Sequence, residues 1–566
     1  MLTELADLKE FVQEGEPVST PAMNDLHSHK VRKYDRQLRL WGDHGQAALE
    51  GAKLCLIGAT STGTEVLKNL VLPGVGSFCV VDEEKVTASD LGSNFFVTAQ
   101  SLGQHRAEVV TRLLLEMNND VKGDYVVDSL DSLLAHRASW LQSFSVIIVA
   151  DNPSEGQLSS LSSLLWNAGI PLVICRAYGT IGYIRIVHKQ HHVIESKPDN
   201  FVPDLRVESP FPQLQVLCDS FNLETMHKKQ HSHLPYVILL VKFLQQWRAQ
   251  HGTLPSTFKE KSKFREYIDE QRLKNEDGVP FPEENFEEAC KAVMKTIAVP
   301  KVPGSLSTLF DDPSCVNLTK SSPKFWIVVR ALKDFTETAG DGFLPLSGAL
   351  PDMFSDTESF IKLQTVYKEK ADSDAEVVFE KVQEFCYSLG LPKDHIKFSE
   401  VKHYCRNAAF LTCIQMTASL EAEYTGGSAV SSVLRGVSED DAEFRSSMWY
   451  VMLRAVDRFY SETSRFPGSA NSTLDEDAMM VKFHASKLLK ICGAGVEFMA
   501  LAADEVLENY AKEVTRSGAE QLHSVAAFIG GCVAQEVIKL VTGQYVPLNN
   551  TLIYDASSCY TRTVQI

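Results

Sequence analysis

The chain lacks the features that mark several large classes of protein. Basic residues are outnumbered, with 55 Lys and Arg against 73 Asp and Glu, so the net charge is −18. A general nucleic-acid binder carries a basic footprint, which excludes nucleic acid as the expected partner. No apolar run approaches the roughly 20 residues that a membrane span needs. The longest candidates, such as 236–243, have the length of a core helix, so we expect no membrane partner.

The 12 cysteines show no C-x-x-C spacing, which argues against the common zinc and thioredoxin-like motifs. No secretory apolar segment opens the sequence, so we expect reduced, mostly buried thiols in a cytoplasmic protein, with the nucleus as a second compartment. No metal site is predicted. His231, His233 and His251 lie near predicted helix ends without an evident acidic or cysteine partner, which favours capping or surface roles.

Alternating strand and helix patterns predict an α/β domain over 31–205, after a flexible extension at 1–30. The expected strands are 53–58, 77–82, 125–128, 145–150 and 171–175, and the expected helices are 62–71, 101–117 and 156–168. Strands that alternate with helices are typical of a doubly wound, mostly parallel, Rossmann-like sheet.

From 206 to 515 the pattern changes to one helix after another, joined by Gly- and Pro-rich segments. The last part, 516–566, returns to α/β, with an apolar helix at 523–542 and strands at 544–553 and 560–566. Gly530-Gly531 in that helix favours close packing of backbones. The sequence therefore predicts a nucleotide-binding type of fold that is interrupted by a large all-helical insertion and completed at the end of the chain.

A glycine-rich loop with its middle glycine missing follows the first strand. Gly58 and Gly63 keep the outer positions of a phosphate-binding loop, while Thr60 stands where backbone must approach pyrophosphate. A β-branched side chain is expected to intrude on that space. Asp82 closes the second strand at the spacing of a ribose-binding acid, although a strand-end turn explains it equally well. The loop predicts a nucleotide fold with a spoiled site.

The segment YDRQLRLWG at 34–42, together with this loop and GGCVAQEVIK at 530–539, resembles the ubiquitin-like-modifier activating enzymes. That resemblance implies a ThiF/MoeB-type adenylation fold. It also implies an activity in which the C-terminus of a modifier is adenylated and then passed to a catalytic cysteine.

Longer stretches resemble the non-catalytic subunits of the heterodimeric members of that family. They are KYDRQLRLWGDHGQ at 33–46, KNLVLPGVG at 68–76, CRAYGTIG at 175–182, ESKPD at 195–199, FIKLQTVY at 360–367 and LRAVDRF at 453–459. The resemblance implies a catalytic partner subunit that binds Mg·ATP, the modifier NEDD8 and a transient conjugating enzyme. It also implies that the helical insertion contributes to the catalytic-cysteine domain of the complex. The corresponding subunit for SUMO is the alternative, which the large insertion disfavours.

Three further positions depart from the active family pattern. By resemblance, Ser93 replaces a phosphate-contacting arginine, Arg106 replaces a phosphate-binding lysine, and Pro153 replaces a magnesium-binding aspartate. Arg106 keeps the charge without the compact ammonium geometry, and a proline side chain offers no oxygen to magnesium. Asp151 is two residues from Pro153, so a shift in register would restore an aspartate. We expect this chain to bind no nucleotide or cofactor of its own.

A transthiolation cysteine must be exposed and activated by a basic group or a helix N-terminus. The Pro-Arg-containing stretch that precedes it in active subunits is not found here. Cys218 is the best-placed candidate, and Cys405 has a neighbouring His and Arg, but a buried structural thiol is the favoured interpretation of both.

Arg36 is the main functional candidate. The resemblance implies that it reaches from this chain to the ATP phosphates on the partner, where a planar, permanently charged fork stabilises phosphate charge. The alternative is a surface arginine paired with Asp35 or another carboxylate. The resemblance also places Phe78, Val86, Gln364 and Tyr367 at the partner interface.

Two other functions fit parts of the sequence. An independent nucleotide-dependent oxidoreductase would need the chain alone to bind its cofactor, which Thr60 disfavours. A scaffold or adaptor would bind the same partners without assisting catalysis, and only measurement distinguishes it from the trans-acting subunit.

Overall fold

The computed structural model describes residues 31–196, 198, 201–297, 302–415, 419–425, 430, 433–434, 442–469 and 473–566. The predicted extension at 1–30 lies outside them. The chain divides into two compact units. Unit 1 contains Met1–Ile186, Leu420–Thr542 and Thr551–Ile566, and unit 2 contains Val187–Ser419 and Gly543–Asn550.

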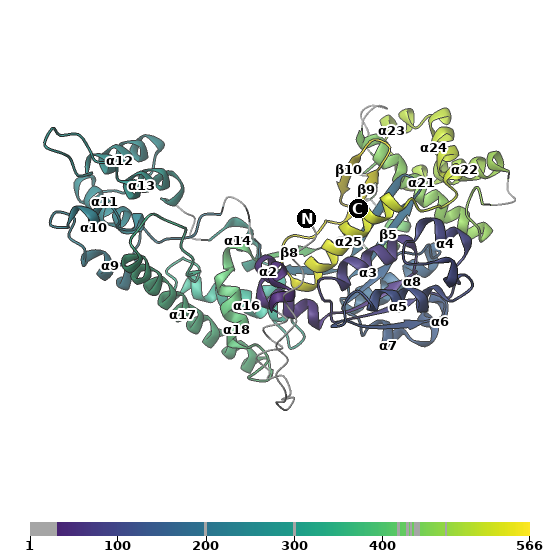
Figure 1. The fold of residues 1–566 in the computed structure, drawn as a ribbon, viewed down its shortest axis with the longest axis horizontal. Coiled ribbons are helices and arrows are strands. Elements are labelled where there is room, and N and C mark those ends of the chain that lie inside the picture. Colours follow the sequence, from purple (N-terminus) through teal and green to yellow (C-terminus); the bar gives the residue numbers. More distant parts are fainter. Residues whose placement is uncertain are drawn as a thin grey trace, which may run out of the picture. The chain divides into compact units, whose positions relative to one another are not determined.

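Unit 1 is an α/β body with a helical layer (Figure 1). Its strands are β1 (Lys53–Ile57), β2 (Ser77–Val81), β3 (Lys122–Val126), β4 (Val146–Val149), β5 (Leu172–Tyr178), β6 (Ile181–Val187, which ends at the boundary), β9 (Thr551–Asp555) and β10 (Tyr560–Val564). Its helices are α2 (Asp35–Gly51), α3 (Ser61–Val71), α4 (Ala88–Ser93), η1 (Ala99–Ser101), α5 (Arg106–Leu115), α6 (Leu130–His136), α7 (Ala138–Leu141), α8 (Glu155–Ala168), α19 (Leu420–Tyr424), α21 (Ala442–Thr463), α22 (Leu474–Ile491), α23 (Val496–Leu501), α24 (Asp504–Ser517) and α25 (His523–Thr542).

The eight strands form one sheet in the order β10-β9-β6-β5-β4-β1-β2-β3. The pairs β1–β2, β1–β4, β2–β3 and β4–β5 are parallel, while β9 pairs antiparallel with both β6 and β10. The central strands β4 and β5 are buried along their whole length, as apolar runs in a covered parallel sheet should be. The order β3-β2-β1-β4-β5 confirms the predicted Rossmann-like sheet.

The predicted close packing in the C-terminal helix is found at Gly530 only. A Cβ on Gly530 would lie 2.6 Å from the Cβ of Glu65 on α3, whereas nothing lies within 4 Å of a Cβ on Gly531. Helix α25 is long and apolar enough to pass as a membrane span by composition, which the sequence analysis did not anticipate. It packs against α3 and β5 (Figure 1). Half of its most apolar stretch is buried inside the protein, as in a core helix.

Unit 2 is almost entirely helical. Its elements are β7 (Gln190–Val193), α9 (Pro212–Asp219), α10 (Lys228–His231), α11 (Tyr236–His251), α12 (Phe258–Glu270), α13 (Glu284–Thr296), α14 (Gly304–Phe310), α15 (Pro313–Val316), α16 (Lys324–Glu337), α17 (Thr357–Ser388), α18 (Phe398–Arg406), η2 (Ala408–Phe410) and β8 (Thr412–Gln415). The long helix α17 joins two hydrophobic cores, with Leu363 and Tyr367 in one and Val378 and Val382 in the other.

The domain boundaries differ from the prediction of one helical insertion over 206–515. The helices from α19 to α24 belong to the α/β body and not to the helical unit. Helix α21 is joined to the sheet by polar contacts as well as by packing. Trp449 donates to Asp555 on β9 at 3.1 Å, and Asp457 forms an ion pair with Arg176 on β5. Apolar periodicity shows that a segment is helical but does not show which body its apolar face covers.

Candidate functional site

The spoiled loop lies where the strand order reverses, between the carboxyl ends of β1 and β4, which is the usual ligand site of such sheets. Its two remaining glycines have packing roles. Gly58 has φ +94° and a Cβ there would lie 2.6 Å from the Cβ of Asp151, while a Cβ on Gly63 would lie 2.4 Å from the carbonyl oxygen of Gly58. The close turn and the close approach of the helix therefore persist although the middle glycine is gone.

Thr60 is bound to the loop itself, and its predicted intrusion on a phosphate stays a prediction. It is the N-cap of α3: its Oγ1 accepts from the backbone N–H of Gly63 at 3.2 Å and donates to the carbonyl of Ala150 at 3.0 Å. A helix N-terminus binds phosphate through its unpaired N–H groups. Thr60 instead satisfies one of those groups itself.

Two more amide donors of the loop are bound to side chains of the same chain. The N–H of Ala59 donates to Asp82 at 2.7 Å, and the N–H of Thr62 donates to Gln521 at 3.0 Å. The hydroxyl of Thr62 also donates to Gln521, at 2.9 Å. A phosphate would have to displace these acceptors before it could bind.

Asp82 acts as a connector between the loop and Arg106. Its carboxylate accepts from Ala59, from the N–H of Glu84 at 2.8 Å and from Arg106. Arg106 lies between two carboxylates, with ion pairs of 3.1 Å to Asp82 and 3.4 Å to Asp90. Burial lowers the pKa of Arg106, but those carboxylates outweigh it and raise the pKa. The one positive charge kept at the predicted phosphate positions is thus neutralised internally.

Neither of the other two predicted positions, Ser93 and Pro153, carries a positive charge or a carboxylate. Ser93 ends α4, and its carbonyl accepts from His523 at 3.0 Å, while Pro153 offers only a ring. The nearby Asp151 accepts from the N–H of Asn152 at 2.9 Å. Burial raises the pKa of Asp151, and the carboxylate of Asp82 adds to the rise. A cluster of acidic groups around a capped loop does not fit a bound triphosphate.

Arg36 is found in a different setting, in the first turn of α2. Its side chain is exposed, and among the described residues it has no carboxylate partner. The alternative of a pair with Asp35 is not found, because Asp35 forms its ion pair with Arg39 at 2.9 Å. Arg36 is therefore a permanently charged group at the surface of unit 1, without an ion pair to any residue that the structure describes.

The candidate thiols are poor nucleophiles. Cys218 is buried, and burial raises its pKa to about 12. Cys405 is buried as well, with its pKa raised for the same reason. At neutral pH neither provides the thiolate that transthiolation requires.

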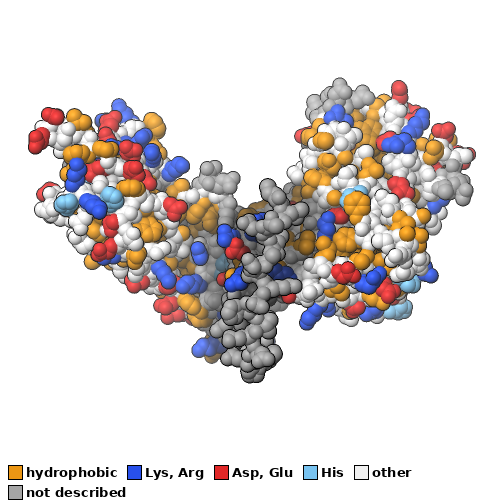
Figure 2. Space-filling view, viewed as in Figure 1, with side chains coloured by type: hydrophobic (Ala, Val, Ile, Leu, Met, Phe, Trp, Pro, Cys, Tyr) orange, Lys and Arg blue, Asp and Glu red, His pale blue; other side chains and the backbone are white. Residues whose placement is uncertain are grey.

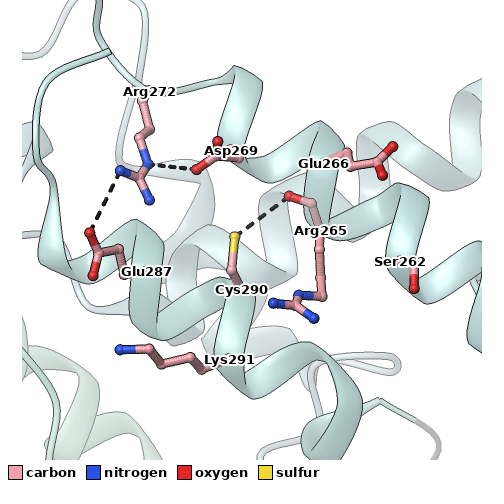
Figure 3. Close-up of a pocket in the computed structure, with 8 residues that line it drawn as sticks. All are labelled: Ser262, Arg265, Glu266, Asp269, Arg272, Glu287, Cys290 and Lys291. Atoms are coloured by element: carbon pink, nitrogen blue, oxygen red, sulfur yellow. Dashed lines mark hydrogen bonds and ion pairs between the residues drawn. The ribbon is translucent and has the colours of Figure 1, made fainter.

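A surface pocket of about 470 Å³ lies between α12 and α13 in unit 2 and was not anticipated from sequence (Figure 3). Its lining charges pair with one another: Arg272 contacts Asp269 at 2.9 Å and Glu287 at 3.8 Å. Cys290 points into this group, but its Sγ donates to the carbonyl of Arg265 at 3.5 Å and burial raises its pKa. The pocket therefore does not activate its thiol.

Three of the four predicted interface side chains belong to the core of the chain, so that prediction was wrong for them. The exposed fractions of Phe78, Val86 and Tyr367 are 2%, 3% and 0%. The ring of Phe78 packs against Gly123, and the hydroxyl of Tyr367 donates to the carbonyl of Leu205. Gln364 is exposed on α17 and stays a prediction.

Comparison with known proteins covers nearly all of the chain. A model of the ThiF family matches residues 34–566. The NEDD8-activating enzyme E1 regulatory subunit of Gallus gallus is 44% identical over 540 residues, covering 95% of this chain and 99% of that relative. The NEDD8-activating enzyme E1 regulatory subunit AXR1 of Arabidopsis thaliana is 38% identical over 526 residues, covering 92% and 94%. Among solved structures, E. coli MccB with AMPCPP and MccA aligns with 28% of this chain and 50% of its own, at a TM-score of 0.25 and 16% identity.

Proposed function

This chain belongs to the ThiF family and, within it, to the regulatory subunits of NEDD8-activating enzyme E1, and from that premise we propose how it divides the work with a catalytic partner. It acts in neddylation as a regulatory subunit. The partner subunit binds Mg·ATP, adenylates NEDD8, carries the thioester cysteine and delivers NEDD8 to a conjugating enzyme. This chain holds no nucleotide, and it completes the adenylation site of the partner through Arg36.

The contrast between two arginines carries the proposal. Arg106 stands at the phosphate position of this chain's own loop, but Asp82 and Asp90 hold it. Arg36 has no such carboxylate among the described residues and is exposed. An arginine that forms no ion pair with a carboxylate is available to bind a phosphate on another chain.

The chemistry of adenylation fits this role. A carboxylate oxygen of the modifier forms a bond to the α-phosphorus of ATP, and the bond to the bridging oxygen breaks, so that pyrophosphate leaves. Negative charge develops on the phosphate oxygens in the transition state, and a guanidinium fork placed there stabilises it. The helical unit 2 and the exposed side of α17, including Gln364, belong to the surface that we assign to the partner complex.

The test is ATP–pyrophosphate exchange by the purified heterodimer. We expect Arg36→Ala to lower kcat/KM for ATP by at least about tenfold and Arg36→Lys to recover only part of it, because an ammonium lacks the bidentate fork. Arg39→Ala is the matched control, since Arg39 is exposed three residues away but paired with Asp35. If Arg36→Ala forms the heterodimer and exchanges at the normal rate, the chain is a scaffold instead.

Separate experiments test the oxidoreductase function, the choice of modifier and the compartment. Calorimetry of the isolated chain with ATP and with NAD should give no stoichiometric binding, and tight binding of NAD would support the oxidoreductase. A thioester assay of the heterodimer should give a product with NEDD8 and none with SUMO. The compartments we propose, the cytoplasm and the nucleus, are checked by fractionation of cells that express the tagged chain.

A further inference from the structure

The short helical segment that carries Arg36 is fixed at both ends by buried aromatic side chains. Tyr34 precedes α2 and is 2% exposed, and Trp41 is 6% exposed just before the kink at Gly42, whose φ is +68°. The indole N–H of Trp41 donates to Gln46 at 3.0 Å, and Gln46 donates to the carbonyl of Pro73 at 3.1 Å. The outward face between the two rings carries Arg36.

The hydroxyl of Tyr34 is the centre of a small polar cluster. It accepts from the amide of Asn118 at 3.0 Å and donates to the carboxylate of Asp120 at 3.0 Å. Asn118 donates in turn to the carbonyl of Val71 at 2.8 Å, and Asp120 forms an ion pair with Lys33 at 2.7 Å. Burial raises the pKa of Tyr34, so its hydroxyl keeps the proton that it donates to Asp120. The start of α2 is thereby joined to the end of α3 and to the connection between α5 and β3.

A glycine makes room for this hydroxyl. Gly74, in the connection from α3 to β2, has φ +87°, and a Cβ there would lie 2.7 Å from the Tyr34 hydroxyl oxygen. The parallel strands β1, β2 and β3 start at this edge of the sheet, at Lys53, Ser77 and Lys122. The cluster therefore lies at the edge of the sheet opposite the capped loop. It holds the start of α2, the segment that carries Arg36.

We propose that Tyr34 is a positioning residue for Arg36, with its hydroxyl held by Asn118 and Asp120 so that the backbone of the first turn of α2, from which the guanidinium extends, is fixed in advance. The proposal rests on the function proposed above. An arginine side chain has several freely rotating bonds, and an arginine on a frayed helix end would have to order its backbone as well on each turnover. Fixing the backbone in advance removes that part of the entropy loss.

The experiment compares two Tyr→Phe variants in the complete heterodimer. Tyr34→Phe removes the hydroxyl and keeps the ring. Tyr178→Phe is the matched control, because its buried hydroxyl donates to the carbonyl of Val514 at 3.0 Å, away from α2. We expect Tyr34→Phe to lower kcat/KM for ATP about fivefold in the exchange assay, and Tyr178→Phe to lower only the melting temperature. Asp120→Ala should match Tyr34→Phe, and Asp120→Asn, which keeps an acceptor oxygen, should recover most of the activity.

A double variant separates positioning from general destabilisation. If Tyr34 acts through Arg36, then Tyr34→Phe has no further effect in the Arg36→Ala heterodimer. An equal fivefold loss in both backgrounds, or normal exchange by Tyr34→Phe while Arg36→Ala is impaired, would overturn the positioning role and leave the function of Arg36 standing. If Arg36→Ala itself exchanges normally, the proposed function fails and the positioning role fails with it.

Discussion

Arg176 on β5 and Asp457 on α21 form a buried ion pair although 281 residues separate them in the chain. They belong to the stretches 175–182 and 453–459, two of those that carried the family resemblance. The pair joins the sheet of unit 1 to its helical layer. Removing one partner of a buried pair leaves the other charge without compensation in a low-dielectric interior.

Asp457→Ala should therefore lower the free energy of unfolding by about 3–5 kcal/mol, because it leaves the Arg176 guanidinium buried and unpaired. Urea denaturation of the isolated chain measures the loss. Glu513→Ala is the control: it removes the exposed partner of Arg516, and we expect a change of at most about 0.5 kcal/mol. Equal effects of the two variants would show that the buried ion pair contributes no more to the free energy of unfolding than an exposed one.

Thr60→Ala removes the N-cap of α3 and should cost about 1 kcal/mol of stability. It should leave ATP–pyrophosphate exchange by the heterodimer unchanged, because in the proposed function the nucleotide binds to the partner subunit and not to this loop. Thr60→Ser keeps a capping oxygen and serves as the control. Thr60→Gly restores the middle glycine, yet we expect no ATP binding to the isolated chain in calorimetry, since Arg106 stays paired with Asp82. Stoichiometric binding would contradict our account of the loop.

The neighbours Gly530 and Gly531 should respond in opposite directions. Gly530→Ala puts a methyl group 2.6 Å from the Cβ of Glu65, which forces α25 away from α3 and should cost about 1–3 kcal/mol. Gly531→Ala meets open space and should stabilise the chain by up to about 1 kcal/mol through helix propensity. Thermal unfolding of both variants decides the matter, and a stabilised Gly530→Ala would contradict the close packing.

Two neighbouring histidines, His191 buried and His192 half-buried, should make stability fall in acid. Burial, with a contribution from His188, lowers the pKa of His191 to about 3 and that of His192 to about 4. Below pH 6.5 these two histidines bind protons in the unfolded chain but stay neutral in the folded chain until the pH is much lower. The stability that the neutral rings contribute is complete above pH 6.5 and is lost as the pH falls towards 4, by on the order of 2–3 kcal/mol for each histidine.

His192→Phe tests the origin of this loss, because a phenyl ring can keep the stack on Phe325, whose centroid lies 4.3 Å away. Denaturant unfolding between pH 7 and pH 4 should show a shallower loss for this variant than for the natural chain. His136→Gln replaces an exposed histidine and should leave the slope as it is. An unchanged slope in His192→Phe would assign the acid sensitivity to other groups.

Charged residues of both signs are mixed on the visible face of each unit, without a large basic patch (Figure 2). This agrees with the acidic composition, which had excluded nucleic acid as the expected partner. Composition fixes the balance of charge, because every ionisable side chain contributes wherever the fold places it.

The amino-acid sequence by itself indicated the class of fold and most of the strands of the parallel part of the sheet. Short apolar runs such as 54–57 and 146–149, next to turn residues, favour buried strands, and the glycines at 58 and 63 mark a tight turn between strand and helix. These are local properties of the chain. They indicated the class of fold and the altered loop without a structure, and the resemblance singled out Arg36, whose exposure the structure then showed.

Tertiary structure decided which groups meet. Gln521 caps a loop that lies 459 residues away in sequence, and nothing local to either segment indicates that contact. Phe78, Val86 and Tyr367 looked suited to an interface, but the core of this chain covers them, since an apolar side chain packs equally well inside its own fold or against a partner. The sequence carries the chemistry of each side chain, and long-range packing determines which of those groups remain free to act.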